Sequence, residues 1–223
     1  MTDHSFTCIL FDLDGTLVDT APDLTEALNH VLERNGLASV TVQQVKNLVG
    51  LGARISIQRS FASYGVEIAD EALDEAHGQF LAHYSANIYK YSVLFPGVET
   101  VLKHFKDQGF KLGVCTNKTQ HLSEELLEKI GIASYFETIC GPNTVPNHKP
   151  HPDHIFAAIE RTGGIAEKSV MIGDSQADVD SAKAAGIPVI AMTYGYTATP
   201  AHELGANLVL DDFSDIPEAL NRL

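Results

Sequence analysis

The chain has 223 residues, of which 44% are hydrophobic and 20% are charged, which argues against a disordered or fibrous protein. Its 15 Lys and Arg residues against 29 Asp and Glu residues give a formal net charge of −14, which disfavours nucleic acid and anionic membranes as general partners. The length is long for one domain and short for two, so we expect a core with one inserted subdomain.

Three cysteines, an odd number, each lie in or beside a short apolar run: Cys8, Cys115 and Cys140. We expect them to be buried free thiols in a reducing compartment. The first residues carry no basic stretch followed by an apolar one, and no apolar run approaches the length of a membrane span. These features predict a cytoplasmic protein, either a monomer or a homodimer.

Short β-branched runs alternate with longer helical patterns, as in the βαβ units of a parallel sheet. Strands are predicted at 7–11, 111–115, 136–140, 169–172 and 188–192, with a short edge strand at 207–210. Helices are predicted between them at 98–107, 119–130, 152–161 and 176–185. The pattern indicates an α/β fold, a three-layer parallel sheet core of the Rossmann type.

The stretch from about residue 22 to residue 91 differs, because it contains helical patterns and no convincing buried strand. Its predicted helices span 22–34, 42–49, 54–64 and 70–88. We therefore expect a catalytic core made of residues 1–20 and 93–223, with residues 21–92 inserted as an all-helical cap. Residues 93–97 make a plausible hinge.

Ligands of an open parallel sheet bind beyond the carboxyl ends of its strands, so the residues that follow each strand are informative. After the first strand, an extended backbone sends Asp12 and Asp14 to the same side. Two neighbouring carboxylates need a cation or a shared proton. An ordinary acidic turn explains this motif alone equally well.

The other strand ends add donors and acids. Thr116 and Asn117 can donate to phosphate oxygens, although both residue types also cap helices. Lys149 precedes a helix and offers a positive charge, unless it is a solvated loop lysine. Asp174 ends a strand and Asp178 lies one turn into the next helix, where both can face one point or serve as caps.

Taken together, several acids, a lysine and a hydroxyl at one sheet edge are hard to explain by capping preferences. A hard cation with oxygen ligands, most simply Mg²⁺, would offset the carboxylate repulsion and hold a phosphate. Lys149 and Thr116 would then bind phosphoryl oxygens. This set predicts a phosphoryl-transfer site.

In this order the motifs resemble those of the haloacid dehalogenase (HAD) superfamily of phosphatases, whose small helical cap occurs where the helical insertion falls. The matching segments are 12–16, 116–117, 149–150 and 173–178. Within the superfamily the chain is most similar to bacterial phosphoglycolate phosphatases, through 12–20, 49–54 and 193–196. Those narrower features are partly shared with sugar phosphatases and pyrophosphatases.

The resemblance implies roles for these residues. Asp12 would be the nucleophile that forms an aspartyl-phosphate, and Asp14 would protonate the leaving oxygen and later deprotonate water. Thr116, Asn117 and Lys149 would bind the substrate, with Thr116 and Lys149 on its phosphoryl group.

A Mg²⁺ ion would be held by the Asp12 carboxylate, the Asp14 backbone carbonyl and Asp174. Asp178 would act as an outer partner of the metal waters or of Lys149.

Two further sets lie outside these motifs. Arg54 in the cap could bind a substrate carboxylate, or it is a surface residue near a helix start. His148, His151 and His154 have a spacing that suggests zinc, but the prolines between them interrupt any helix, so a metal role is disfavoured.

The function implied is a Mg²⁺-dependent phosphatase acting on a small phosphorylated metabolite, with 2-phosphoglycolate the first choice. A sugar phosphatase, a pyrophosphatase and a β-phosphoglucomutase-like mutase remain alternatives. A dehalogenase is disfavoured because this chain keeps Asp14. A non-catalytic interaction module is the alternative from another class.

Overall fold

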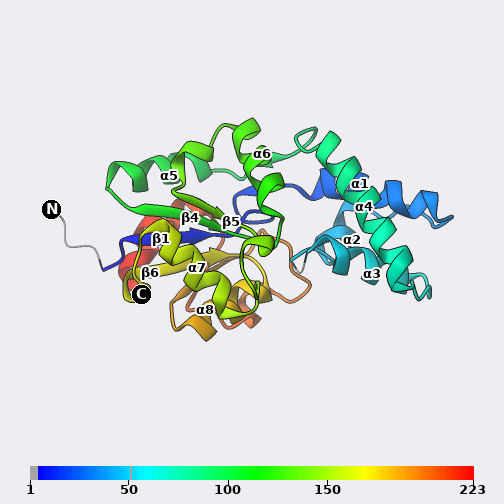
Figure 1. Ribbon diagram of the computed structural model, residues 1–223. Coiled ribbons are helices and arrows are strands. Elements are labelled where there is room, and N and C mark those ends of the chain that lie inside the picture. Colours follow the sequence, from blue (N-terminus) through cyan, green and yellow to red (C-terminus); the bar gives the residue numbers. More distant parts are fainter. Residues whose placement is uncertain (1–4, 51) are drawn as a thin grey trace.

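The computed structural model describes residues 5–50 and 52–223 (Figure 1). Its centre is a six-stranded sheet in the order β5-β4-β1-β6-β7-β8, with every pair parallel. The strands are β1 (Cys8–Phe11), β4 (Lys111–Cys115), β5 (Thr138–Cys140), β6 (Ser169–Gly173), β7 (Val189–Met192) and β8 (Leu208–Leu210). The predicted α/β class and parallel sheet are confirmed.

Helices cover both faces of the sheet, because alternate residues of its strands are apolar on opposite sides. One face packs against α5 (Val98–Asp107) and α6 (Gln120–Ile130), and the other against α7 (Pro152–Thr162) and α8 (Gln176–Ala185). Short α9 (Ile216–Ala219) joins the first layer. The result is the three-layer core that the sequence predicts.

Several details differ from the sequence prediction. The helices predicted at 42–49 and 70–88 end earlier, at Lys46 and Ala86. Strand β5 begins at Thr138 rather than at Phe136, because Phe136 ends a 3-10 turn, η1 (Ala133–Tyr135). A two-stranded antiparallel ribbon, β2 (Val18–Asp19) with β3 (Val93–Leu94), was not expected. It joins the two chain crossings between the sheet and the helices of residues 21–86.

Those helices are α1 (Ala21–Arg34), α2 (Val42–Lys46), α3 (Ala53–Ser63) and α4 (Asp70–Ala86). They gather beyond one end of the sheet, at the right of Figure 1. Helices α1 and α4 pack against each other through buried apolar side chains such as Leu28 and Phe80. Leu51, part of the 49–54 segment used above, lies outside the described residues, as do residues 1–4.

All three cysteines are free and buried, as expected. Within the described chain, no helix combines the length and hydropathy that crossing a membrane requires.

Candidate active site

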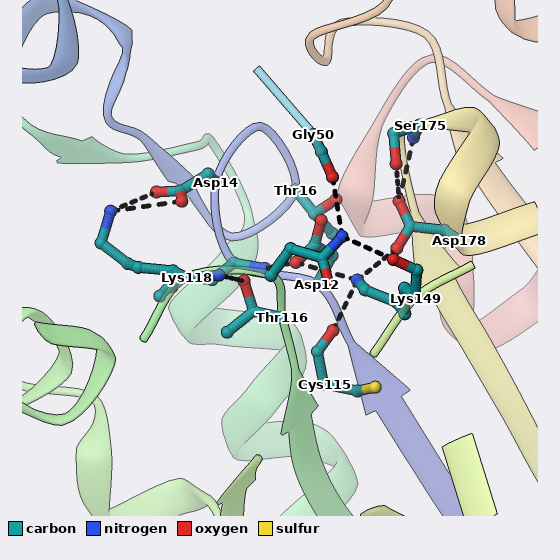
Figure 2. Close-up of polar contacts among 12 residues, drawn as sticks. Asp12, Asp14, Thr16, Gly50, Cys115, Thr116, Lys118, Lys149, Ser175 and Asp178 are labelled. Atoms are coloured by element: carbon teal, nitrogen blue, oxygen red, sulfur yellow. Dashed lines mark hydrogen bonds and ion pairs between the residues drawn. The ribbon is translucent and has the colours of Figure 1, made fainter. Parts of the chain in front are cut away.

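The carboxyl ends of three adjacent strands bring the predicted residues together (Figure 2). Phe11 of β1 is in register with Val114 of β4 and with Ile172 of β6, so these strands end at one level. The residues that follow them therefore share one edge. Those residues are Asp12, Thr116 and Asp174, and all three are buried.

Lys149 reaches this edge from the start of α7 and is not the solvated loop lysine considered above, since it is 1% exposed. Its Nζ lies 2.5 Å from Asp178 Oδ1, 2.7 Å from the Cys115 carbonyl and 3.2 Å from Asp12 Oδ1. Burial alone would lower the pKa of Lys149, but the charges of Asp12 and Asp178 outweigh it and raise the pKa. The lysine is therefore a fixed cation.

Asp12 is held beside this cation in an environment that disfavours its charge. Burial raises the pKa of Asp12 to about 7, and the charges of Asp178 and Asp14 add to the rise, while Lys149 opposes it. The Leu13 backbone N–H also donates to Asp12 Oδ1 at 2.7 Å. Burial thus disfavours the ionised form of Asp12, and a further cation would favour it.

Asp174 shares this excess of negative charge. Burial raises its pKa well above the ordinary value, with Asp12 and Asp178 contributing, although Thr16 Oγ1 and the Tyr196 N–H each donate to it at 2.6 Å. Two glycines allow this position. A side chain at Gly15 or Gly195 would collide with the Asp174 carboxylate.

A hard cation fits this set of acids. One oxygen each from Asp12, Asp174 and Asp178 lies within 4.8 Å of the others. Both oxygens of Asp178 are already engaged, Oδ1 by Lys149 and Oδ2 by Ser175 Oγ at 2.7 Å and by two backbone N–H groups. Asp178 thus already has a cation beside it, whereas the donors to Asp174, from Thr16 and Tyr196, are neutral. Asp12 and Asp174 are therefore the carboxylates best placed for Mg²⁺, while Asp178 orients Lys149.

Asp14 points to a different set of partners from Asp12, as the left of Figure 2 shows. Its Oδ1 accepts from Thr20 Oγ1 at 2.7 Å, and its two oxygens lie 3.1 and 3.2 Å from Lys118 Nζ. The Asp14 carboxylate is thus separate from the acid cluster around Lys149. Both Asp12 and Asp14 line one cavity.

The second strand end contacts the connection between α2 and α3. Asn117 Nδ2 donates to the carbonyl of Gly50, in the α2–α3 connection, at 2.9 Å and to that of Lys149 at 3.0 Å. Thr116 Oγ1 accepts from the Lys118 N–H at 3.2 Å. Thr116 is buried beside the acids and lines the same cavity.

This cavity, of about 370 Å³, lies between the sheet edge and the helices of residues 21–86. Its apolar wall comes mainly from α1, α3 and α4, and includes Leu24, Leu28, Ile55 and Phe80. Such a volume suits a small ligand.

Arg54 also lines this cavity, but its guanidinium is already engaged. Its Nε lies 3.0 Å from Asp74 Oδ1 and one Nη lies 3.2 Å from Asp70 Oδ1, both acids belonging to α4. Two nitrogens of its guanidinium therefore already contact acidic partners on α4.

Sequence reasoning assigned no role to Lys118, although it directly follows Asn117. Its side chain is 5% exposed, and its Nζ lies 4.2 Å from the centre of the Tyr84 ring on α4. The signal available in the sequence was a lysine at a strand end, directly after the motif residue Asn117. Tyr84 gave no such signal, because its position in the sequence is that of a residue on the apolar face of a helix.

The three histidines do not converge. His151 Nδ1 accepts from the Asp153 N–H at the start of α7, and His148 Nδ1 lies 3.0 Å from the Lys149 carbonyl. His154 is buried, with Nδ1 accepting from the Lys149 N–H at 3.2 Å and Nε2 lying 2.9 Å from the Cys140 carbonyl. These contacts require a neutral His154 ring protonated on Nε2, which fixes the backbone of Lys149.

This neutral histidine predicts an acid-sensitive fold. Burial, aided by Lys149, lowers the pKa of His154 to about 4 from 6.5. Folding therefore favours the neutral ring, and its stability contribution, up to about 3 kcal/mol, is lost as pH falls from 6.5 through 4. We expect His154→Asn to show a smaller loss of melting temperature over this range than wild type. Equal losses would contradict this origin of the acid sensitivity.

Known proteins resemble the chain over nearly its whole length. Residues 9–192 match the family described as haloacid dehalogenase-like hydrolase. Phosphoglycolate phosphatases of Agrobacterium fabrum and Caulobacter vibrioides are each 43% identical over 211 residues, covering 95% of this chain and 91% and 89% of those proteins. A crystal structure described as a predicted phosphoglycolate phosphatase from Haemophilus somnus gives a TM-score of 0.90 at 31% identity, covering 97% of this chain and 99% of that one.

Proposed function

The chain belongs to the haloacid dehalogenase-like hydrolase family, and from that premise we propose that it is a Mg²⁺-dependent phosphatase that converts 2-phosphoglycolate to glycolate and phosphate. The observation that carries the chemistry is the buried pair of Asp12 and Lys149 beside Asp174, of which Asp12 lines the cavity. The substrate is proposed from the names of the 43% identical relatives. In this proposal residues 1–20 and 93–223 are the catalytic core and residues 21–92 are the cap.

Asp12 attacks phosphorus through a carboxylate oxygen, and the bond between phosphorus and the ester oxygen breaks. Lys149, 3.2 Å away, favours the ionised form of Asp12 that this attack needs. Lys149 and the Thr116 hydroxyl would bind the transferred phosphoryl oxygens. Held by Asp12 and Asp174, with the Asp14 backbone carbonyl as a further ligand, Mg²⁺ would supply positive charge against those oxygens.

Asp14 transfers the protons of both steps. Protonated, it donates to the ester oxygen as glycolate leaves, and the resulting carboxylate then takes a proton from the water that attacks the aspartyl-phosphate. That water releases inorganic phosphate and restores Asp12. Lys118, 3.1 Å from Asp14, stabilises the carboxylate form that the second step requires.

The cap would exclude bulk water during these steps. Two of its contacts with the core at the site are the hydrogen bond from Asn117 to the Gly50 carbonyl and the approach of Lys118 to the Tyr84 ring, which a moving cap would break and re-form. Water that entered freely would weaken the ion pairs and hydrogen bonds of the site.

Phosphate release tests the proposal. With Mg²⁺, we expect turnover of 2-phosphoglycolate to exceed that of hexose and pentose phosphates, a nucleoside monophosphate and pyrophosphate, and chelator should abolish it. Mg²⁺ should also raise the melting temperature by roughly 5–10 °C at 100 times its dissociation constant. Asp174→Asn should lose this shift. Preference for another ester would contradict the substrate, and phosphate retained on a sugar product would indicate a mutase.

A further inference from the structure

The cavity between sheet edge and cap carries polar atoms without partners. Tyr84 Oη, Asn117 Oδ1 and Thr119 Oγ1 are buried, line the cavity and accept or donate no hydrogen bond within the described chain. A buried polar atom without a partner costs about 1–3 kcal/mol. The Tyr84 and Thr119 hydroxyls can donate, whereas Asn117 Oδ1 can only accept. The two hydroxyls in this cavity indicate an acceptor group on the ligand, despite the apolar wall.

Lys118 supplies a cation at the same place. Its ammonium lies between the Asp14 carboxylate, 3.1 Å away, and the face of the Tyr84 ring. It pairs with one acid, whereas Arg54 pairs with two and Lys149 pairs with two. An ammonium has three N–H donors, so Lys118 can bind a further anionic group.

The proposed chemistry fixes where such a group would lie. Asp14 must reach the ester oxygen to protonate it. In phosphoglycolate the carboxylate carbon is two covalent bonds from that oxygen, so the carboxylate sits beside Asp14. Without a cation between them, two carboxylates would repel each other. Lys118 is the cation found there.

We infer that Lys118, with the Tyr84 hydroxyl as a second donor, binds the substrate carboxylate and so selects phosphate monoesters that carry an anionic group next to the ester oxygen. This inference rests on the proposed function and deepens it. It assigns to Lys118 the role that the sequence suggested for Arg54. The salt bridges of Arg54 to α4 then stabilise the cap rather than bind substrate.

Two esters of nearly equal size separate this role from an effect on Asp14. One is 2-phosphoglycolate, and the other is 2-hydroxyethyl phosphate, in which a hydroxymethyl group replaces the carboxylate. Any effect through Asp14 changes the turnover of both esters. Loss of carboxylate binding lowers kcat/KM for phosphoglycolate alone, mainly through KM.

For Lys118→Met we expect the ratio of kcat/KM for phosphoglycolate over hydroxyethyl phosphate to fall roughly 10- to 100-fold, the value of a charge-assisted hydrogen bond. Tyr84→Phe should lower the ratio less. Arg54→Met should leave it unchanged, as should Lys103→Met, a matched control in an exposed ion pair with Asp107. An equal loss on both esters in Lys118→Met would overturn the inference, and so would a selective loss in Arg54→Met.

Calorimetric titration of the product glycolate gives a readout that needs no turnover. Wild type should bind glycolate in the presence of phosphate, and Lys118→Met should bind it at least 10-fold more weakly. Equal binding would overturn the inference. A wild type that hydrolyses none of the esters would instead contradict the proposed function, while the glycolate titration still decides the role of Lys118.

Discussion

Asp12→Asn is expected to abolish phosphate release without unfolding the protein. Asparagine has nearly the same shape, but its amide cannot form the aspartyl-phosphate, so kcat should fall at least about 10⁴-fold, as for nucleophiles of other covalent enzymes. Lys149 keeps its 2.5 Å contact with Asp178 in the variant. The binding site around the lost nucleophile therefore stays assembled.

Stability makes this prediction sharper. The raised pKa of Asp12, about 7, means that its ionised form is penalised by folding, and this penalty grows as pH rises from 3.8 through 7. Asparagine removes the penalty. In chelator at pH 8 the melting temperature of Asp12→Asn should equal or exceed that of wild type, while Asp107→Asn, an exposed control, should keep full activity. Residual turnover above about 1% would exclude Asp12 as the nucleophile.

The fold could be predicted because its strands are buried on both faces. A run such as 8–11 is continuously apolar and follows from the sequence alone. The two-residue strands β2 and β3 could not be predicted, since they pair with each other over a long stretch of chain. Val18 pairs with Leu94, 76 residues later, and Asp19 pairs with Val93, 74 residues later. Segments of two residues are too short to produce a periodic hydrophobic pattern in the sequence.

The site was predictable where a strand end fixes a side chain, as for Asp12 and Asp174. Contacts between distant elements were not. Lys118 contacts Asp14, which lies 104 residues earlier, and Arg54 contacts acids 16 and 20 residues later, on α4. Residue type and spacing show which groups are present, but packing decides which charges remain unpaired.

Lys149→Met should damage both activity and stability. Methionine fills a similar volume but leaves the carboxylates of Asp12 and Asp178 buried without their cation. Breaking a buried ion pair in this way costs about 3–5 kcal/mol, which corresponds to a fall in melting temperature of roughly 6–20 °C. Activity should fall at least about 10³-fold, because Asp12 loses the charge that favours its ionised form.

A double variant distinguishes lost charge compensation from poor packing of methionine. In Asp12→Asn/Lys149→Met one of the two stranded carboxylates is gone, so the double variant should be more stable than Lys149→Met alone by at least about 1 kcal/mol. Urea unfolding in chelator measures this coupling without metal bound to the acids. Lys103→Met serves as the matched control and should change stability by less than about 1 kcal/mol, since its partner is exposed. The contradicting result is that the effects of the two substitutions simply add and that Asp12→Asn does not stabilise the Lys149→Met variant. Lys149 would then not compensate the charge of Asp12, despite its contacts with Asp12 at 3.2 Å and with Asp178 at 2.5 Å.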